Sequence, residues 1–185
     1  MYLTTNPGKV REAREILIEQ HGLEFHIQAP PFELPEVQAD TCSKVAAFKA
    51  QFAADRLGKP VLVSDSGLYV ECLGGLPGPY NAQFEQQLGT QKFLELLQHQ
   101  SNRKAHLEHC FAYCTPDGEP VVFSGGSSGT LALEARGTLG RWHEKFYIPE
   151  GETLTLSELR ALDPEREKPH WGRAMHDFAA WLRSP

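Results

Sequence analysis

The N-terminal run Thr4-Thr5-Asn6-Pro7-Gly8-Lys9 joins a short predicted strand to the start of a predicted helix. A helix start presents free backbone N–H groups and the positive end of the helix dipole, which together favour an anion. Lys9 adds a full charge there, and Asn6 or Thr5 can add side-chain donors, so this turn can hold a phosphate. The alternative is that Asn6 only caps a surface helix and Lys9 is solvated. The GxxxxGK[ST] spacing of a Walker A loop is absent.

Asp65 is the second candidate, because it follows the apolar run PVLV and precedes Ser66 and Gly67. This pattern predicts an acid at the carboxyl end of a buried strand, the edge at which α/β sheets bind ligands. A carboxylate there can hold Mg²⁺ or activate water, and Glu36 can share the metal if the fold brings the two segments together. The alternative is that Asp-Ser-Gly forms an ordinary turn.

Lys49 lies beside Phe48 and Phe52 in a predicted helix, where an unpaired lysine facing the core would be unusual. The alternative is a solvated lysine on the outer face of that helix. Two late loops gather aromatic rings and imidazoles of the kind that can stack on a flat base, or that can simply pack in a core: Trp142, His143, Phe146, His170 and Trp171. The histidines lack HxxxH spacing, which disfavours zinc.

Hydrophobic periodicity predicts an α/β fold with a mixed, largely central sheet to position these side chains. The predicted strands are residues 2–5, a segment from residue 23, the PVLVS run, residues 68–73, and antiparallel strands between 105 and 133 broken at Pro116-Asp117-Gly118 and at Gly125-Gly126. The predicted helices start after Asn6 and cover residues 40–57, 90–100, 156–162 and 172–182. The apolar face of the second helix is predicted to hold Val45, Phe48, Phe52 and Ala53.

The composition is that of an ordinary globular protein. In 185 residues, 41% are hydrophobic and 23% charged, and the net charge is −6, which excludes a global positive field that would gather nucleic acid or an anionic membrane. Four cysteines without a CxxC pair predict reduced thiols. Neither an apolar run long enough to span a bilayer nor an N-terminal signal pattern is visible. These features predict a soluble, cytoplasmic protein of a single domain over residues 1–185.

Five segments in chain order resemble the inosine triphosphate pyrophosphatase family, hydrolases that remove deaminated purine nucleotides. They are TTNPGKVREAREIL, LPE, SDSGLYVECLGGLPGPY, FYIPEG and PHWGRAM, and they extend nearly from end to end. The most specific piece is SDSGL followed at a fixed distance by GGLPGPY. The resemblance implies an elongated α/β fold of two lobes with a nucleotide cleft between them, a homodimer, and Mg²⁺-dependent hydrolysis of a nucleoside triphosphate to monophosphate and pyrophosphate.

The same resemblance implies roles for individual residues. Thr5, Asn6 and Lys9 would hold phosphates, and Lys49 would match the helix lysine that faces the triphosphate. Glu36 and Asp65 would be the metal and water-activating carboxylates, with Asp65 and Lys49 catalytic. Ser66 and Gly67 would shape the same loop.

The base-recognition end departs from the family pattern. Arg141, Trp142, His143, Glu144 and Lys145 stand where the family commonly has F-G-Y/W-D-P, and Pro169, His170 and Trp171 stand where it has Ser-His-Arg. The family's discriminating arginine is therefore replaced by Trp171, and Lys168 receives no assigned base contact. The acid often found before the catalytic aspartate is Ser64 here. The phosphate chemistry is kept, and purine selection is rewritten.

Three functions fit this pattern. The first is a Mg²⁺-dependent pyrophosphatase for non-standard purine nucleotides such as ITP, dITP or XTP. The second is a nucleotide-binding module with lost or altered turnover, and the third is a pyrophosphatase for a different base. In the base pocket, Trp142, His143, Glu144, His170 and Trp171 are the predicted substrate contacts.

Overall fold

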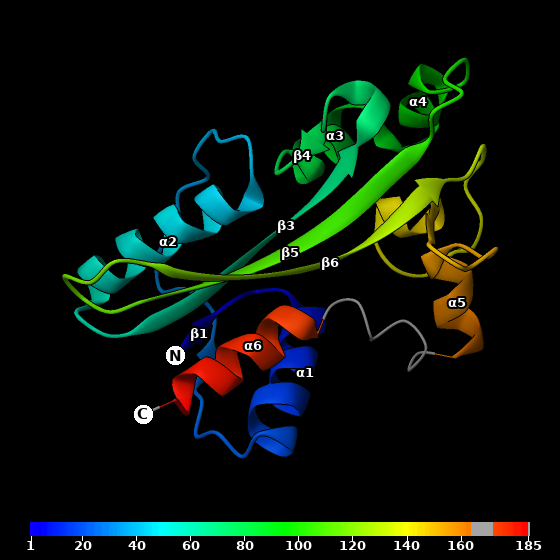
Figure 1. Ribbon diagram of the computed structural model, residues 1–185. Coiled ribbons are helices and arrows are strands. Elements are labelled where there is room, and N and C mark those ends of the chain that lie inside the picture. Colours follow the sequence, from blue (N-terminus) through cyan, green and yellow to red (C-terminus); the bar gives the residue numbers. More distant parts are fainter. Residues whose placement is uncertain (164–171, 185) are drawn as a thin grey trace. The chain divides into compact units, whose positions relative to one another are not determined.

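The computed structural model describes residues 1–163 and 172–184, so Lys168, Pro169, His170 and Trp171 lie outside the described residues. A mixed seven-stranded sheet forms the centre, with the order β2-β1-β3-β5-β6-β7 and with β4 paired to β3 (Figure 1). The strands are β1 (Tyr2–Leu3), β2 (Ile27–Gln28), β3 (Val61–Val70), β4 (Pro77–Gly78), β5 (Lys104–Cys114), β6 (Val121–Leu131) and β7 (Tyr147–Pro149). The predicted α/β fold with a mixed sheet flanked by helices is confirmed.

Contacts divide the chain into two compact units. Of the described residues, unit 1 contains Met1–Asp65, His109–Gly125 and the C-terminal helix, and unit 2 contains residues 66–108 and 126–163. The boundary falls inside β3, at the peptide bond between Asp65 and Ser66. The single domain with a nucleotide cleft between two lobes stays a prediction. No helix in the described part of the chain combines the length and the apolar character needed to cross a membrane.

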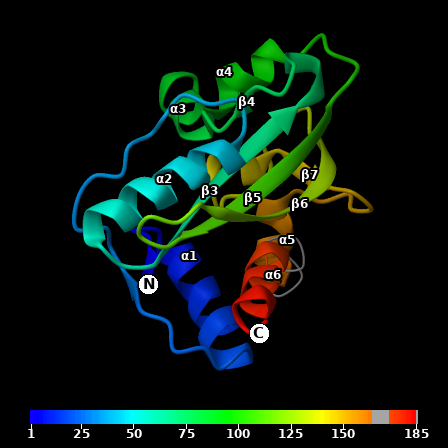
Figure 2. The ribbon, with the colours of Figure 1, turned by 60° about the vertical axis from the view of Figure 1, so that its left-hand side comes forward.

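In unit 1, one face of the sheet packs against the N-terminal and C-terminal helices (Figure 2). The N-terminal helix is α1 (Pro7–Ala13), which continues as the π-helical segment η1 (Arg14–Gln20), and the C-terminal helix is α6 (Arg173–Leu182). Leu17 and Phe178 from these helices meet Tyr2, Leu62 and Phe111 of the sheet in one buried cluster. The predicted helix after Asn6 and the predicted C-terminal helix are therefore confirmed, the latter beginning one residue later.

The helix α2 (Cys42–Leu57) covers the other face of the sheet in unit 1 (Figure 1). It begins at the Thr41 cap and ends at Gly58, which adopts a left-handed conformation at φ 61°. The prediction that Phe48 lies on the buried face is wrong, because Phe48 is 46% exposed. The buried face is instead made of small residues and Lys49. Alanines at positions 46, 50, 53 and 54 allow the helix to approach the sheet closely.

Two predicted breaks in the strands are wrong. β3 continues through Gly67, and β6 continues through Gly125-Gly126. These glycines permit close packing within the sheet layer: a Cβ at Gly67 would lie 2.7 Å from the carbonyl oxygen of Gly78 in β4, and one at Gly126 would collide with the backbone of Leu107. Leu68 and Tyr69 accordingly belong to β3, and residues 71–73 form a short 3-10 turn rather than a strand.

Unit 2 packs aromatic rings around the helix α4 (Gly89–Leu96). Phe93 of α4 contacts Trp142 and Phe146, with ring centroids 5.1 and 5.5 Å apart. Trp142 belongs to the 3-10 segment η3 (Trp142–Lys145), which lies between β6 and β7 in sequence. Among the described residues of the unit, further α-helices are α3 (Asn81–Gln87) and α5 (Leu156–Leu162), and α5 has the predicted bounds.

Candidate functional site

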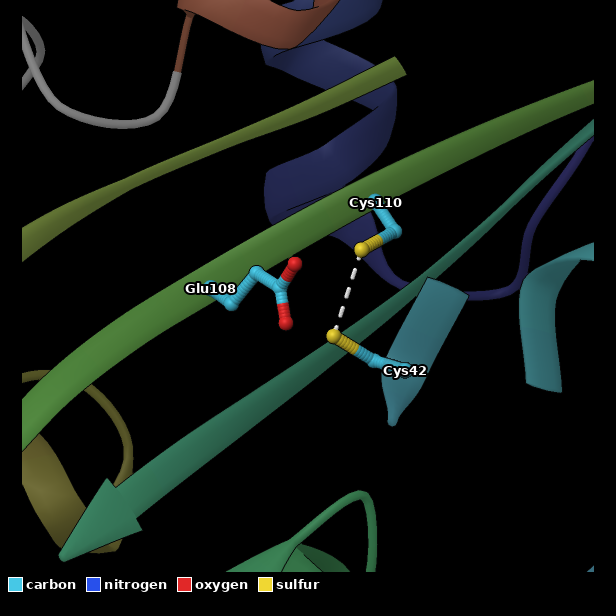
Figure 3. Close-up of side chains that lie close together, drawn as sticks. All are labelled: Cys42, Glu108 and Cys110. Carbon is cyan, nitrogen blue, oxygen red and sulfur yellow. Dashed lines mark hydrogen bonds between the residues drawn. The ribbon is translucent and has the colours of Figure 1, made fainter. Parts of the chain in front are cut away.

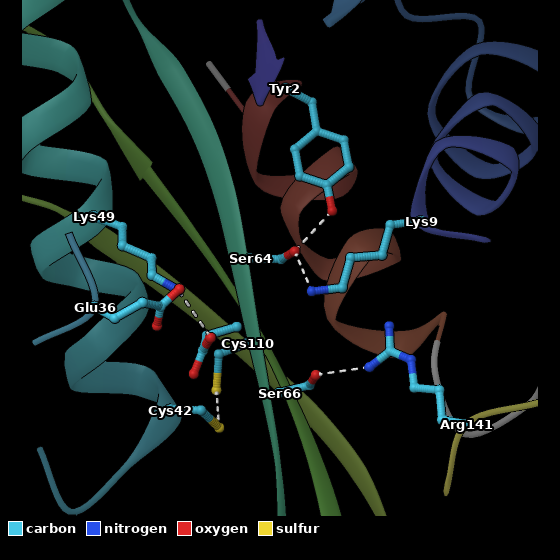
Figure 4. A network of polar contacts seen from close by, with 10 residues as sticks. Tyr2, Lys9, Glu36, Cys42, Lys49, Ser64, Ser66, Cys110 and Arg141 are labelled. Carbon is cyan, nitrogen blue, oxygen red and sulfur yellow. Dashed lines mark hydrogen bonds and ion pairs between the residues drawn. The ribbon is translucent and has the colours of Figure 1, made fainter. Parts of the chain in front are cut away.

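A lysine and two carboxylates meet on the α2 side of β3 in unit 1 (Figure 4). The Nζ atom of Lys49 lies 2.7 Å from Oε1 of Glu36 and 3.1 Å from Oδ1 of Asp65. The side chain of Lys49 is only 6% exposed, and that of Asp65 14%, while Glu36 is 61% exposed. Lys49 is thus neither the solvated lysine of the alternative reading nor unpaired. The structure brings Glu36, Lys49 and Asp65 together, as the family resemblance implied.

Asp65 lies within β3 rather than at its carboxyl end, so the predicted strand boundary is wrong. The neighbouring parallel strand β1 pairs with β3 at Leu62 and ends at Leu3. Asp65 therefore lies just beyond the carboxyl end of β1, beside the turn that leads into α1. The strand whose carboxyl end lies beside Asp65 is therefore β1, not the strand β3 that contains Asp65.

The carboxylate of Asp65 lies in an unfavourable electrostatic environment. Burial raises its pKa above the ordinary value, and the negative charge of Glu36 acts in the same direction, while Lys49 and Lys9 oppose the shift. Its Oδ2 atom is buried and has no hydrogen-bond partner in the described part of the chain. A buried acceptor without a donor is costly, and such groups concentrate at functional sites.

These two acids fit a divalent cation. Mg²⁺ prefers carboxylate oxygens and is usually held by one or two of them. Oδ2 of Asp65 lacks a partner, and Glu36 places a second negative charge close enough to raise the pKa of Asp65. A bound cation would offset the repulsion between the acids. Glu36 and Asp65 are therefore the described residues whose chemistry suits the predicted metal.

A second polar cluster contains Lys9, whose Nζ donates to Oγ of Ser64 at 2.9 Å (Figure 4). The hydroxyl of Tyr2 lies 2.8 Å from the same Oγ atom. Successive side chains of a strand point to opposite faces, so Ser64 faces the α1 side and Asp65 the α2 side. From the family pattern alone, Ser64 is only the replacement of an acid, and Tyr2 carries no functional signal. The alternation along β3 is the signal that identifies Ser64 as a partner of Lys9.

Asn6 acts as the helix cap in this structure. Its Oδ1 accepts hydrogen bonds from the backbone N–H groups of Gly8 and Lys9, at 2.9 and 3.3 Å. Oδ1 of Asn6 therefore caps the helix, as the alternative interpretation of this turn stated. Thr5 is exposed on the same turn. Phosphate contacts by Thr5 and Asn6 stay predictions.

In unit 2, Ser66 accepts a hydrogen bond at 3.3 Å from the guanidinium of Arg141 (Figure 4). Arg141 is partly exposed and directly precedes η3. In the sequence, Arg141 is recognisable only as a departure from the family pattern, because its distance of 75 positions from Ser66 carries no local signal. Gly67 is buried against β4, so its role in the structure is close strand packing.

Trp142, His143 and Glu144 are buried in unit 2, with exposures of 4%, 1% and 3%. The indole N–H of Trp142 donates to Oδ1 of Asn81 at 3.2 Å, and Nδ2 of Asn81 lies 3.1 Å from Nδ1 of His143. Glu144 pairs with Arg160 at 2.8 Å. These contacts correct the prediction of a base-stacking surface, because the rings and the acid are occupied by packing and hydrogen bonds within the unit. The predicted contacts by His170 and Trp171 lie outside the described residues.

His143 makes stability depend on pH. Burial, aided by the positive charges of Arg141 and Arg160, lowers its pKa to about 3 from an ordinary value near 6.5. Below about pH 6.5 the unfolded chain therefore binds a proton that the folded protein does not bind, and stability falls as the pH falls. We expect the free energy of unfolding to drop between pH 7 and pH 5, and to drop less in His143→Gln.

Urea unfolding at the two pH values measures this effect. The exposed His99 supplies the matched control, since His99→Gln is expected to retain the wild-type pH dependence. Equal pH dependence in His143→Gln and wild type would contradict the assignment.

Comparisons with known proteins agree along the whole chain. The sequence pattern of the Ham1 family matches residues 1–181. The dITP/XTP pyrophosphatase of Thermococcus kodakarensis is 41% identical over 182 residues, covering 98% of this chain and 96% of that protein. The dITP/XTP pyrophosphatase of Methanopyrus kandleri is 38% identical over 184 residues, covering 100% of this chain and 96% of that protein.

Solved structures agree with the fold. A HAM1 protein from Coxiella burnetii matches with a TM-score of 0.84 at 26% identity, covering 98% of this chain and 96% of that one. The Ham1 protein of Staphylococcus aureus matches with a TM-score of 0.82 at 25% identity and the same coverage of 98% and 96%. The predicted family resemblance is confirmed: the chain belongs to the Ham1 family.

Proposed function

We propose that this protein hydrolyses nucleoside triphosphates between the α and β phosphates, releasing nucleoside monophosphate and pyrophosphate, and that it acts on non-standard purine nucleotides such as dITP, ITP and XTP. The observation that carries the proposal is the Glu36–Lys49–Asp65 cluster, in which Lys49 and Asp65 are largely buried and one carboxylate oxygen of Asp65 has no hydrogen-bond partner among the described residues. The relatives named dITP/XTP pyrophosphatases support the substrate class.

In this proposal Asp65 is the general base. Lys49 engages Oδ1, which leaves Oδ2 to accept a proton from the attacking water. Lys49 also lies between the two acids, where its charge favours the ionised form of Asp65 that a base requires. Glu36 and Asp65 would hold Mg²⁺, which supplies charge neutralisation to the departing pyrophosphate.

Lys9 is the proposed phosphate ligand. Its ammonium already reaches a hydroxyl oxygen, Oγ of Ser64, which a phosphate oxygen can replace or join. Ser64 and Asp65 are consecutive residues of β3 whose side chains face opposite sides of the strand, so Lys9 and the proposed base would act on the nucleotide from these two sides.

A panel of ribo- and deoxyribonucleoside triphosphates, assayed with and without Mg²⁺, tests the proposal. We expect monophosphate and pyrophosphate from dITP, ITP or XTP, and loss of turnover when Mg²⁺ is chelated. Diphosphate and orthophosphate as products would contradict the cleavage position. Tight binding without turnover would favour the nucleotide-binding module, and a preference for another base would favour the third function.

Lys9→Ala is expected to weaken binding of the triphosphate more than binding of the monophosphate, because a lysine binds phosphate as a point charge and the extra phosphates carry the extra charge. Isothermal titration of both ligands, using a non-hydrolysable triphosphate analogue, measures the difference. The salt dependence of triphosphate binding is also expected to fall.

The exposed Arg11 on the same helix supplies a control of equal charge, and Arg11→Ala is expected to leave both affinities unchanged. Equal losses for the two ligands in Lys9→Ala would instead assign Lys9 a structural role through Ser64. The homodimer and the cytoplasmic location stay predictions of the family resemblance and of the composition.

A further inference from the structure

Two buried cysteines face each other in unit 1 (Figure 3). Cys42 is the first residue of α2, and Cys110 lies in β5. Their Sγ atoms are 3.2 Å apart although the residues are separated by 68 positions in the sequence. Both side chains are fully buried, and both cysteines are thiols in this structure. A close pair of thiols on two different elements is a different feature from the carboxylate cluster, and it has no part in the proposed hydrolysis.

We propose that Cys42 and Cys110 form a reversible intramolecular disulfide under oxidising conditions. A disulfide bond is about 2.05 Å long, so the two sulfur atoms must approach by roughly 1.2 Å. Cys42 occupies the first turn of α2, and this approach requires movement of a helix start rather than of a helix centre. The proposed bond therefore involves movement at the start of α2.

The reaction is a two-electron oxidation. Each thiol loses its hydrogen, the S–S bond forms, and two protons and two electrons pass to an oxidant. Hydrogen peroxide accepts them and becomes two waters, while a small-molecule disulfide accepts them and becomes two thiols. A dithiol reductant reverses the reaction by exchange.

Hydroxyl groups provide an approach to the buried pair. The Oγ atoms of Ser43 and Ser124 each lie 3.3 Å from Sγ of Cys110, and they lie 3.4 Å from each other. Ser124 is exposed and Ser43 is partly exposed. The sulfur of Cys110 thus lies directly beneath polar groups that reach solvent, where a peroxide can be hydrogen-bonded.

The other two cysteines are placed differently. The thiol of Cys114 donates to the carbonyl oxygens of Thr115 and Gly118, both at 3.3 Å, and burial raises its pKa. Cys72 belongs to unit 2, whereas Cys42 and Cys110 belong to unit 1. The geometry therefore selects one pair among the four thiols.

The bond would tie the start of α2 to β5. A disulfide that closes a long loop restricts the unfolded chain, so it raises the thermal midpoint of unfolding. The same helix carries Lys49, which lies seven residues after Cys42, about two turns along the helix axis.

Mass spectrometry of the intact, full-length protein tests the proposal independently of catalysis. Reduced protein is treated with hydrogen peroxide or oxidised glutathione, unfolded in the presence of an alkylating reagent, and digested without reduction. We expect a loss of about 2 Da, protection of two thiols from alkylation, and a cross-linked peptide pair containing Cys42 and Cys110. Dithiothreitol is expected to restore all the thiols and to lower the thermal midpoint again.

Matched serine variants assign the bond. The double variant Cys72→Ser with Cys114→Ser keeps only the proposed pair and is expected to respond like wild type. Cys42→Ser and Cys110→Ser are each expected to abolish both the cross-link and the oxidation-dependent rise in thermal midpoint. Four thiols still open to alkylation after oxidation, or a cross-link that joins other cysteines or two chains, would overturn the proposal.

Discussion

Asp65→Asn is expected to lower kcat for pyrophosphate release by about 10²-fold or more while the fold is retained, because general-base catalysis typically contributes that much. The amide keeps the size of the carboxylate but accepts no proton at neutral pH and offers the metal a weaker ligand. The fold is retained because Lys49 keeps its 2.7 Å pair with Glu36. The substitution also removes the cost of burying a charged carboxylate that has one oxygen without a hydrogen-bond partner. Steady-state kinetics at saturating Mg²⁺, with circular dichroism of the same sample, measure both results.

The control is Asp40→Asn, at a position just before the start of α2. Asp40 is an exposed carboxylate paired with Lys44 at 2.7 Å, so its replacement removes one lysine-paired acid outside the cluster. We expect near wild-type kcat from Asp40→Asn. If Asp65→Asn also retained near wild-type kcat, the proton would be accepted elsewhere, and Glu36 would be the next residue to test.

Lys49→Ala is expected to lower both stability and activity. Removing one member of a buried ion pair leaves its partner uncompensated, at a typical cost of about 3–5 kcal/mol. Since Glu36 is 61% exposed and can turn to solvent, the uncompensated charge is mainly that of Asp65, and we expect a loss near the lower end of that range. Activity falls as well. Lys49 opposes the rise in the pKa of Asp65 that burial causes, so without the lysine a smaller fraction of Asp65 is ionised and able to act as a base. Urea unfolding and steady-state kinetics measure the two losses.

Two further variants separate charge from packing. Lys44→Ala removes an exposed lysine whose pair with Asp40 leaves side-chain exposures of 65% and 71%, and it is expected to leave the free energy of unfolding nearly unchanged. Lys49→Met with Asp65→Asn removes both charges and keeps the volume, so it is expected to recover much of the stability but none of the activity. A single Lys49→Ala variant as stable as wild type would show that the site rehydrates and that the pair contributes little.

The family and most of the fold could be predicted from the sequence, because their signals are local. The Asn6 cap, the apolar period after it and the capping residues of the helix at 156–162 each depend on residues a few positions apart. The segments SDSGL and GGLPGPY keep their order and spacing whatever the fold does with them. The carboxylates and lysines of the candidate site were accordingly identified by residue type and position.

Only the tertiary structure decided which side chains are buried and which partners they meet. Lys49 and Phe48 are neighbours on one helix, and nothing local shows that the lysine faces the sheet while the ring is 46% exposed. That choice depends on Glu36 and Asp65, which lie on other segments and offset the cost of burying the charge. Glycines at 67 and 126 were misread for the same reason, since the backbone that excludes a side chain there belongs to distant residues.

The segment Trp142–Lys145 shows most clearly that side-chain partners cannot be inferred from the sequence alone. Trp142 and His143 have the composition of either a stacking surface or a core, and the sequence left both open. The structure places them around Asn81, which lies 62 positions from His143, and surrounds the indole with Phe93 and Phe146. Residue type fixes what a side chain can do, whereas burial and long-range partners decide which of those actions it performs. The sequence by itself determined the family, most of the helices and the chemically capable residues. The tertiary structure decided the helix at Asn81–Gln87 and which of the capable residues meet one another.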